Sequence, residues 1–209
     1  MMAAANVSDW VLWLDDDLLV VNKPAGLLTI PHGYDPTQPY LVDLFRKDYG
    51  SLWVVHRLDR ETSGVIVLAR NPQSHRNLNT QFEQRRTQKI YHALVIGMPD
   101  WTKLHIDLPL RIDGDRKHRT IIDPRGGKIA STDVQLLERL GNYSLIEAQP
   151  HSGRRHQIRA HLAAKGHPIV VDELYGDGQA VKLSAVKPDY RSGSQDEKPL
   201  LETRSSAWS

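Results

Sequence analysis

Short apolar runs separated by polar turns make up most of the chain. Runs at residues 11–14 and 18–22 flank three consecutive aspartates and predict a β-hairpin. Further apolar or alternating runs predict strands at 52–55, 65–69, 89–97, 104–110, 132–137 and 143–148. The spacing therefore predicts a core that is built mainly on β-strands.

Helical periodicity is confined to three segments. Residues 41–49 carry apolar positions three and four apart, a second segment opens at Asn71-Pro72, and a third covers 155–165 and stops at Gly166. These helices do not alternate regularly with the strands. We therefore expect an α+β fold and not a doubly wound parallel sheet.

The composition is that of an ordinary globular protein. Of 209 residues, 40% are hydrophobic and 25% are charged. The length predicts one domain over 11–209 after a tail at 1–10, and the polar segment 191–198 is predicted to be a mobile loop. The absence of cysteine excludes disulfides and thiolate metal sites. No apolar run approaches the roughly 20 residues of a membrane span, and the start lacks signal-peptide features, so we expect a cytoplasmic protein with no membrane contact.

Basic residues cluster although the net charge is small. The chain has 27 basic and 25 acidic residues, which gives +2. Residues 151–167 hold four Lys/Arg, four His and no acid, and residues 111–128 hold six Lys/Arg against three Asp. Such clusters can bind phosphates. A solvated charged face is the plainer interpretation of either run alone.

The loop at residues 56–64, between two predicted strands, carries a carboxylate among cations. Asp59 stands between Arg57 and Arg60, whose charges favour its ionised form. An ionised carboxylate on a loop held by a rigid scaffold suits a nucleophile or general base. A hairpin turn with surface ion pairs is the alternative interpretation.

A second basic segment opens the third predicted helix. Arg154, Arg155 and His156 lie at its start, and Arg155 and Arg159 are four apart and so predicted to share a face. Helix N-termini favour phosphate, so cations there indicate an anionic partner. An exposed basic helix end is the alternative.

Tyrosine and histidine supply the remaining candidates. Tyr91 lies in the predicted strand 89–97, where core packing is the usual role of a tyrosine. Histidines at 151, 156, 161 and 167 are five, five and six apart, unlike the i, i+4 pair of a helical zinc motif, and no carboxylate lies among them. We therefore expect no metal site.

Four segments, in order, resemble the RluA-type pseudouridine synthases. The loop matches the family's central motif in His56-Arg57-Leu58-Asp59 and Thr62-Ser63-Gly64. Residues 20–27 are similar to the family's opening, 89–97 to its second motif, and 153–162 with 166–169 to its third. The likeness runs from about residue 11 to 175, and the shared order makes it specific.

The resemblance implies a pseudouridine synthase fold: a long, mostly antiparallel curved sheet with flanking helices and a central active-site cleft. It implies that Asp59 is the catalytic carboxylate, that Tyr91 stacks on the base and that Arg159 pairs with Asp59. Arg57 would fill the space left by a flipped nucleotide. Further RNA contacts would come from His56, Arg154, Arg155 and His156. The implied partner is RNA, a ribosomal or transfer RNA stem-loop, with no cofactor and no obligate protein partner.

The chain departs from the family pattern near its C-terminal end. Val171 stands where the family usually has glycine before Asp172, and Ser152 replaces a threonine but keeps the hydroxyl. Residues 197–201 would lead into a further strand of the sheet, yet residues 204–209 end the chain there. The expectation is a truncated or frayed end that lowers stability or activity.

Two other functions would use the same residues differently. A non-catalytic RNA-binding module of the same fold would use the basic clusters but not Asp59. A carboxylate hydrolase such as a glycosidase usually needs two acids that flank the cleaved bond, and Glu61 is the only acid nearby in the sequence.

Overall fold

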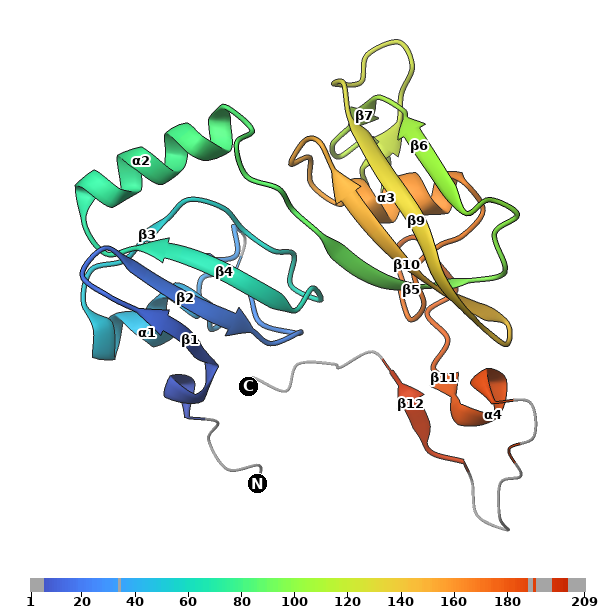
Figure 1. The fold of residues 1–209 in the computed structure, drawn as a ribbon, viewed down its shortest axis with the longest axis horizontal. Coiled ribbons are helices and arrows are strands. Elements are labelled where there is room, and N and C mark those ends of the chain that lie inside the picture. Colours follow the sequence, from blue (N-terminus) through green and yellow to red (C-terminus); the bar gives the residue numbers. More distant parts are fainter. Residues whose placement is uncertain (1–5, 34, 188–189, 191–196, 203–209) are drawn as a thin grey trace. The chain divides into compact units, whose positions relative to one another are not determined.

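The computed structural model describes residues 6–33, 35–187, 190 and 197–202. They form two compact units, one from residues up to 87 and one from residue 88 onward (Figure 1). The expectation of one catalytic domain over 11–209 stays a prediction. No helix within the described ranges has both the length and the apolar character that crossing a membrane requires.

The first unit is a four-stranded antiparallel sheet with two α-helices. Its strands are ordered β1-β2-β4-β3. Along the chain, its elements are the 3-10 helix η1 (Val7–Trp10), β1 (Val11–Leu14), β2 (Leu18–Lys23), α1 (Leu41–Tyr49), β3 (Trp53–Val54), β4 (Gly64–Ala69) and α2 (Pro72–Glu83).

The acidic turn between β1 and β2 closes the predicted hairpin. The Oδ1 atom of Asp15 accepts hydrogen bonds from the amides of Asp17 and Leu18 at 2.8 and 2.7 Å, and its Oδ2 accepts one from Nε1 of Trp13 at 2.8 Å. These bonds hold the pKa of the Asp15 carboxyl below its usual value, with the bond from Trp13 as the largest cause. An aspartate that bonds to nearby backbone amides favours a turn over a continuing strand.

One face of the first sheet forms a core. In the ladder between β2 and β4, Leu19 lies opposite Leu68 and Val21 lies opposite Ile66, and all four side chains are fully buried. Phe45 of α1 is also fully buried. Alternation along both strands therefore gives the sheet one apolar side, which anchors the loop that precedes β4.

The second unit contains a longer antiparallel sheet, ordered β5-β10-β9-β6. Its strands are β5 (Tyr91–Ile96), β6 (Lys103–Asp107), β9 (Ser131–Leu140) and β10 (Tyr143–Pro150). The other elements are two short strand pairs and two helices: β7 (Leu110–Arg111) with β8 (Ile121–Ile122), β11 (Val181–Lys182) with β12 (Pro199–Leu201), α3 (Gln157–Ala164) and α4 (Leu183–Val186).

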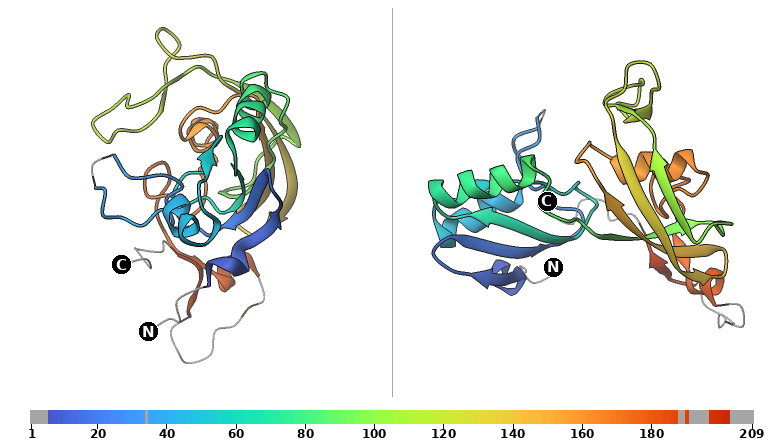
Figure 2. Two further views of the ribbon diagram at one scale, coloured as in Figure 1. Left: turned by 90° about the vertical axis from the view of Figure 1, so that its left-hand side faces the viewer. Right: turned by 45° about the horizontal axis from the view of Figure 1, so that its top comes forward.

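Helix α3 lies against one face of this sheet, as Figures 1 and 2 show. Leu162 of α3 belongs to a buried cluster with Val95, Ile106, Val134 and Ile146 from the four strands. The opposite face is polar over β6, β9 and the end of β10, where Lys103, Gln135 and Gln149 line an open hollow. The two sides of one sheet thus differ in chemistry.

The α+β class and the antiparallel sheets are confirmed, but several element boundaries differ from the prediction by two or three residues. The regular strand predicted at 104–110 stops at Asp107. Beyond it the pairing continues irregularly, with a bond from the Leu108 amide to the Ala130 carbonyl and a bridge between Leu110 and Lys128, and Leu110 also pairs with β8. The third helix begins at Gln157, because His156 adopts a left-handed conformation with φ of 53°. Within the predicted loop 191–198, residues 191–196 lie outside the described residues, as do residues 203–209 at the predicted frayed end.

Candidate active site

Asp59 lies on the loop between β3 and β4 of the first unit, and the loop is fastened on both sides of it. On one side, Thr29 is 2% exposed, and its hydroxyl donates to the carbonyl of Leu58 at 2.9 Å and accepts from the Leu58 amide at 3.3 Å. On the other side, the carbonyl of Arg60 accepts a bond from the amide of Gly26 at 2.9 Å. The backbone next to Asp59 is therefore held by the segment that follows β2.

Lys23 completes this fastening from inside the core. Its side chain is fully buried, and Nζ donates to the carbonyls of Pro24, Leu27 and Arg60 at 2.8, 2.7 and 3.1 Å. Burial lowers the pKa of Lys23 to about 8, although the negative charges of Glu61 and Asp59 act in the opposite direction. Lys23 lies in the segment 20–27 that resembles the family's opening, but the resemblance implied no role for it. The sequence feature that could have indicated its role is a lysine at an inward-facing position of an apolar strand.

His56, predicted to contact RNA, is held by protein groups. The amide of Val67 in β4 donates to Nε2 of His56 at 3.0 Å, and the imidazole stacks on Phe82 of α2 with ring centroids 4.8 Å apart. Since Nε2 accepts this bond, the proton of the neutral ring lies on Nδ1. His56 thus attaches the beginning of the loop to β4 and α2, and its contact with RNA stays a prediction. Arg57 is exposed.

In the second unit, Arg159 of α3 holds a carboxylate from beyond the helix. Its Nε and Nη2 atoms donate to Oδ2 and Oδ1 of Asp172 at 2.7 and 2.8 Å. The amides of Leu174 and Tyr175 also donate to Oδ1, at 3.0 and 3.1 Å. Burial opposes ionisation of Asp172, but the bonds and charge of Arg159 and the two amides outweigh it, so the pKa of Asp172 lies below its usual value.

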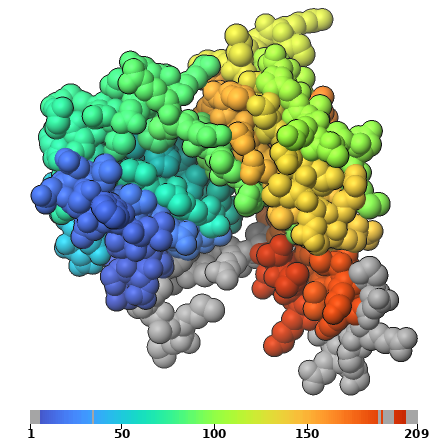
Figure 3. Space-filling model, viewed as in Figure 1, coloured from blue at the N-terminus to red at the C-terminus, as the bar shows by residue number. Residues whose placement is uncertain are grey.

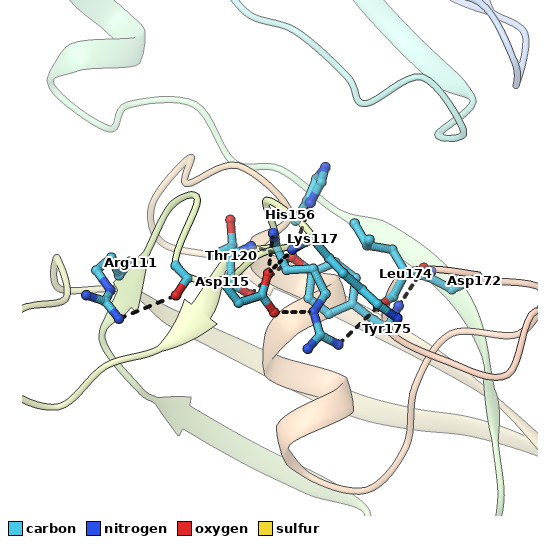
Figure 4. Close-up of polar contacts among 10 residues, drawn as sticks. Arg111, Asp115, Lys117, Thr120, His156, Asp172, Leu174 and Tyr175 are labelled. Carbon is cyan, nitrogen blue, oxygen red and sulfur yellow. Dashed lines mark hydrogen bonds and ion pairs between the residues drawn. The ribbon is translucent and has the colours of Figure 1, made fainter.

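Tyr175 supports the same guanidinium from one side. The Cζ atom of Arg159 lies 4.9 Å from the centre of the Tyr175 ring, a cation–π distance. The Tyr175 hydroxyl accepts from the amide of Thr120 at 2.8 Å, donates to the Thr120 carbonyl at 3.1 Å, and lies 3.1 Å from Nδ1 of His156 (Figure 4). Burial raises the pKa of Tyr175. Neither Asp172 nor Tyr175 was predicted from the sequence to support Arg159.

Two buried polar side chains fix α3 to the sheet. Gln157 accepts bonds from the Ser152 hydroxyl and the Arg154 amide through Oε1, and Nε2 donates to Ser131 and Thr132. His161 is fully buried; Nδ1 lies 2.9 Å from the hydroxyl of Thr132, and Nε2 lies 2.9 Å from the Leu108 carbonyl. Burial lowers the pKa of His161, against the opposing effect of the Leu108 bond. These bonds fix both the position of α3 on the sheet and its rotation about its own axis, and α3 carries Arg159.

The basic segment before α3 differs from the prediction. Arg154, Arg155 and His156 precede the helix, so the prediction that Arg155 shares a helical face with Arg159 is wrong. Arg155 is exposed, and its Nη1 pairs with Oδ1 of Asp113 at 2.8 Å. Although its own segment contains no acid, Arg155 is therefore paired with an acid from a distant part of the chain.

Tyr91 begins β5, directly opposite Ala148 of β10. The pairing of these strands is regular from Tyr91 to Ile96, so alternation places Tyr91 on the same side as Val95, which is the side that α3 covers. In the second unit, Tyr91 therefore lies on the side of the sheet that is covered by α3. That helix carries Arg159, which contacts Asp172 and Tyr175. Asp59 lies in the first unit, and its pairing with Arg159 stays a prediction.

Val171 carries backbone strain where the family pattern has glycine. Its φ is 60°, in the left-handed region that a β-branched residue rarely adopts. The next residue, Asp172, is the partner of Arg159. The departure noted in the sequence therefore falls at a position whose conformation favours glycine.

Known proteins share both the sequence and the fold. A family model described as RNA pseudouridylate synthase matches residues 17–164. The chain is 36% identical over 175 residues to the dual-specificity RNA pseudouridine synthase RluA of Salmonella typhi, which covers 83% of this chain and 80% of the relative. It is 40% identical over 184 residues to an uncharacterized RNA pseudouridine synthase of Aquifex aeolicus, with 82% and 57% covered.

A solved structure, that of human RNA pseudouridylate synthase domain containing 1, superposes with a TM-score of 0.70 at 28% identity and covers 85% of this chain and 75% of its own. The matched residues 17–164 include the loop with Asp59, the strand with Tyr91 and the helix with Arg159. The chain belongs to the RNA pseudouridylate synthase family.

Proposed function

We propose that this protein isomerises selected uridines in folded RNA to pseudouridine, with Asp59 as the catalytic carboxylate. The observation that carries the proposal is the family match over residues 17–164, which spans all three proposed catalytic residues. The fastened loop around Asp59 supports it, because catalysis needs a reacting group whose position is fixed. The alternative, a non-catalytic RNA-binding module, gives no reason to hold a carboxylate in this way.

The reaction exchanges one glycosidic bond for another. The bond between N1 of uracil and C1′ of the ribose breaks, the base turns, and C5 bonds to C1′; the proton leaves C5, and N1 gains one. Asp59 acts either as a nucleophile at C1′ or as a base that removes the C2′ proton, and both routes need an ionised carboxylate. Neither route needs an electron or a phosphoryl acceptor, so the proposal includes no cofactor.

Arg159 is proposed to hold Asp59 ionised and oriented. A guanidinium has five N–H donors in a rigid plane, and Asp172 uses two of them along one edge. A second carboxylate can approach another edge of the same plane. The bidentate bond to Asp172 and the ring of Tyr175 fix that plane, which supports the assignment of Arg159 to a positioning task.

Tyr91 is proposed to stack on the uracil and to assist the loss of the C5 proton. It is the first residue of β5 and is partly exposed, while its backbone belongs to the sheet. An aromatic ring next to a reacting base stabilises an extruded nucleotide.

RNA recognition is assigned to the loops and the basic segments. The target uridine has to leave its stack, which costs a few kcal/mol and least in a loop. Arg57 is exposed on the Asp59 loop and is proposed to occupy the vacated space. His56, Arg154, Arg155 and His156 are proposed to contact the RNA around it, so affinity should fall steeply with salt. A ribosomal or transfer RNA stem-loop is the expected substrate, and such a substrate favours action in the cytoplasm.

Incubation with unmodified RNA transcripts tests the proposal. Purified protein should convert uridine to pseudouridine in a ribosomal or transfer RNA stem-loop, as measured by nucleoside analysis of the digested RNA. Released uracil would instead indicate a hydrolase, and binding without either product would favour the non-catalytic module. Mapping pseudouridine in RNA from cells with and without the gene would then identify the site.

A further inference from the structure

Two histidines and an aspartate converge on the polar face of the second sheet. Nδ1 of His105 lies 2.5 Å from Oδ1 of Asp133, and Nε2 of His151 lies 2.6 Å from Oδ2 of the same carboxylate. One ligand atom from each residue can be chosen so that all three lie within 4.8 Å of one another. Three donors from distant parts of the sequence therefore point at one small volume.

The sheet fixes these positions. His105 of β6 lies directly opposite Asp133 of β9, and Gln149 of β10 lies opposite Asp133 on the other side. His151 follows β10, and its amide donates to the carbonyl of Ser131 at 3.0 Å, so the backbone pairing with β9 extends to this residue. Donors on paired strands are placed more accurately than donors on loops.

The site is separate from the proposed active site. The alternation of β6 and β9 puts His105 and Asp133 on the face opposite Ile106 and Val134, which pack in the cluster with Leu162 of α3. Arg159 belongs to that helix. In Figure 3 the residues of β6 and β9 lie uncovered at the surface that faces the viewer. A hollow of about 410 Å³, lined in part by His105 and Asp133, leaves room for solvent ligands.

We propose that His105, Asp133 and His151 form a binding site for one divalent transition-metal ion of the zinc class. Two imidazole nitrogens and one carboxylate oxygen are the donors that suit zinc, and its neighbours nickel, cobalt and copper, whereas magnesium and calcium prefer all-oxygen sites. Three protein ligands leave at least one coordination position for water. No metal site was expected from the sequence, because Asp133 and His105 are far from His151 along the chain and come close to it only in the fold.

Such an ion would join three segments that lie apart in the sequence. It would link β6, β9 and the residue that begins the 151–156 loop, which leads to α3. Ions that bind only the folded state stabilise it by mass action, and more so as their free concentration rises above Kd. The ion is therefore assigned a structural task, and the isomerisation needs no step through it.

Titration of the chelator-treated full chain with zinc chloride tests the proposal. Calorimetry should show one saturable site per chain at neutral pH, with cobalt giving the visible absorption of a low-symmetry site, and magnesium giving no binding. Loss of a partner in the second shell of a metal already costs about 10–100-fold in affinity, so His105→Gln, Asp133→Asn and His151→Gln should each cost at least that.

His92→Gln is the matched control. His92 is an exposed histidine of the same sheet, 3.6 Å from the carboxylate of Glu147 and outside the cluster. This variant should bind zinc as tightly as the parent protein, and far-ultraviolet circular dichroism should show all four variants folded. Absence of a stoichiometric site, or equal affinity in His105→Gln and His92→Gln, would mean that the three residues form a hydrogen-bonded cluster only, and would overturn the proposal.

Discussion

Arg159 donates two parallel hydrogen bonds to the two carboxylate oxygens of Asp172, at 2.7 and 2.8 Å. The side chain of Asp172 is 5% exposed and that of Arg159 is 19% exposed, so this is a largely desolvated ion pair. Burying charges is costly, and removing one partner of such a pair leaves the other charge buried without compensation. The guanidinium of this pair is the one proposed to hold the catalytic carboxylate.

Asp172→Asn should therefore lower both stability and turnover. The amide nitrogen of asparagine would face an N–H group of Arg159, and breaking one partner of a buried pair costs about 3–5 kcal/mol. Urea unfolding measures the first effect. In the activity assay, kcat should fall more than the RNA dissociation constant rises, because Arg159 is misplaced while the basic loops remain.

Asp113→Asn provides the control for that experiment. Asp113 pairs with Arg155 at a similar distance of 2.8 Å, but both side chains are 40% or more exposed. Exposed pairs are worth about 0–1 kcal/mol. Equal losses of stability in the two variants would show that the buried pair of Asp172 and Arg159 contributes no more to stability than an exposed pair.

Val171→Gly should raise the free energy of unfolding. Val171 has a φ of 60°, and the left-handed region costs an ordinary residue roughly 1–2 kcal/mol. Glycine removes that strain and adds unfolded-state entropy, so the expected gain is about 1 kcal/mol. Val170→Gly, at a buried neighbour whose φ is not in that region, should destabilise the protein instead. A loss of stability in Val171→Gly would contradict the strain argument.

The buried neutral His161 predicts acid sensitivity. Its pKa is lowered in the folded protein, mainly by burial, so below the ordinary value of 6.5 the unfolded chain binds the proton more readily. Stability contributed by this group is present above pH 6.5 and is lost as the pH falls below it. The difference in urea midpoint between the parent protein and His161→Gln should shrink from pH 7.5 to pH 5. A constant difference would exclude this role.

Lys23→Met should loosen the loop that carries Asp59. Methionine replaces the apolar stem of lysine with an unbranched chain one heavy atom shorter, and it removes the donor to three carbonyl groups, including that of Arg60. Leaving a buried carbonyl without a partner costs about 1–3 kcal/mol. We expect a loss of a few kcal/mol in urea unfolding and reduced turnover. Lys47→Met, at an exposed position of α1, should change neither; equal effects would show that the loss of a positive charge, and not of the three buried bonds, causes the change.

Periodicity predicted those elements whose local signals agree with their tertiary environment. The hairpin around Asp15 and the start of α2 carry explicit signals: an aspartate that accepts backbone bonds, and Asn71 before Pro72, with its side chain accepting from the amide of Ser74 at 2.8 Å. The start of α3 could not be located in this way, because the left-handed conformation of His156 accompanies a tertiary contact with Tyr175.

Candidate site residues could be proposed from the sequence where a motif contains them, but not where contacts between distant residues define them. Asp59, Tyr91 and Arg159 stand in recognisable local patterns, and the family assignment follows from them. The roles of Asp172 and Tyr175 depend on contacts to Arg159 that no spacing rule encodes. Likewise, His105 and Asp133 are 28 residues apart and meet only because β6 pairs with β9.

Asp59→Asn tests the central claim most directly, with Glu61→Gln on the same loop as its control. Glu61 is an exposed acid that pairs with Arg60 at 3.2 Å. The account predicts that Asp59→Asn binds an RNA stem-loop nearly as tightly as the parent protein but forms pseudouridine only at background level, whereas Glu61→Gln remains active. Pseudouridine formation at the parent rate by Asp59→Asn would contradict the assignment of this carboxylate as the catalytic group.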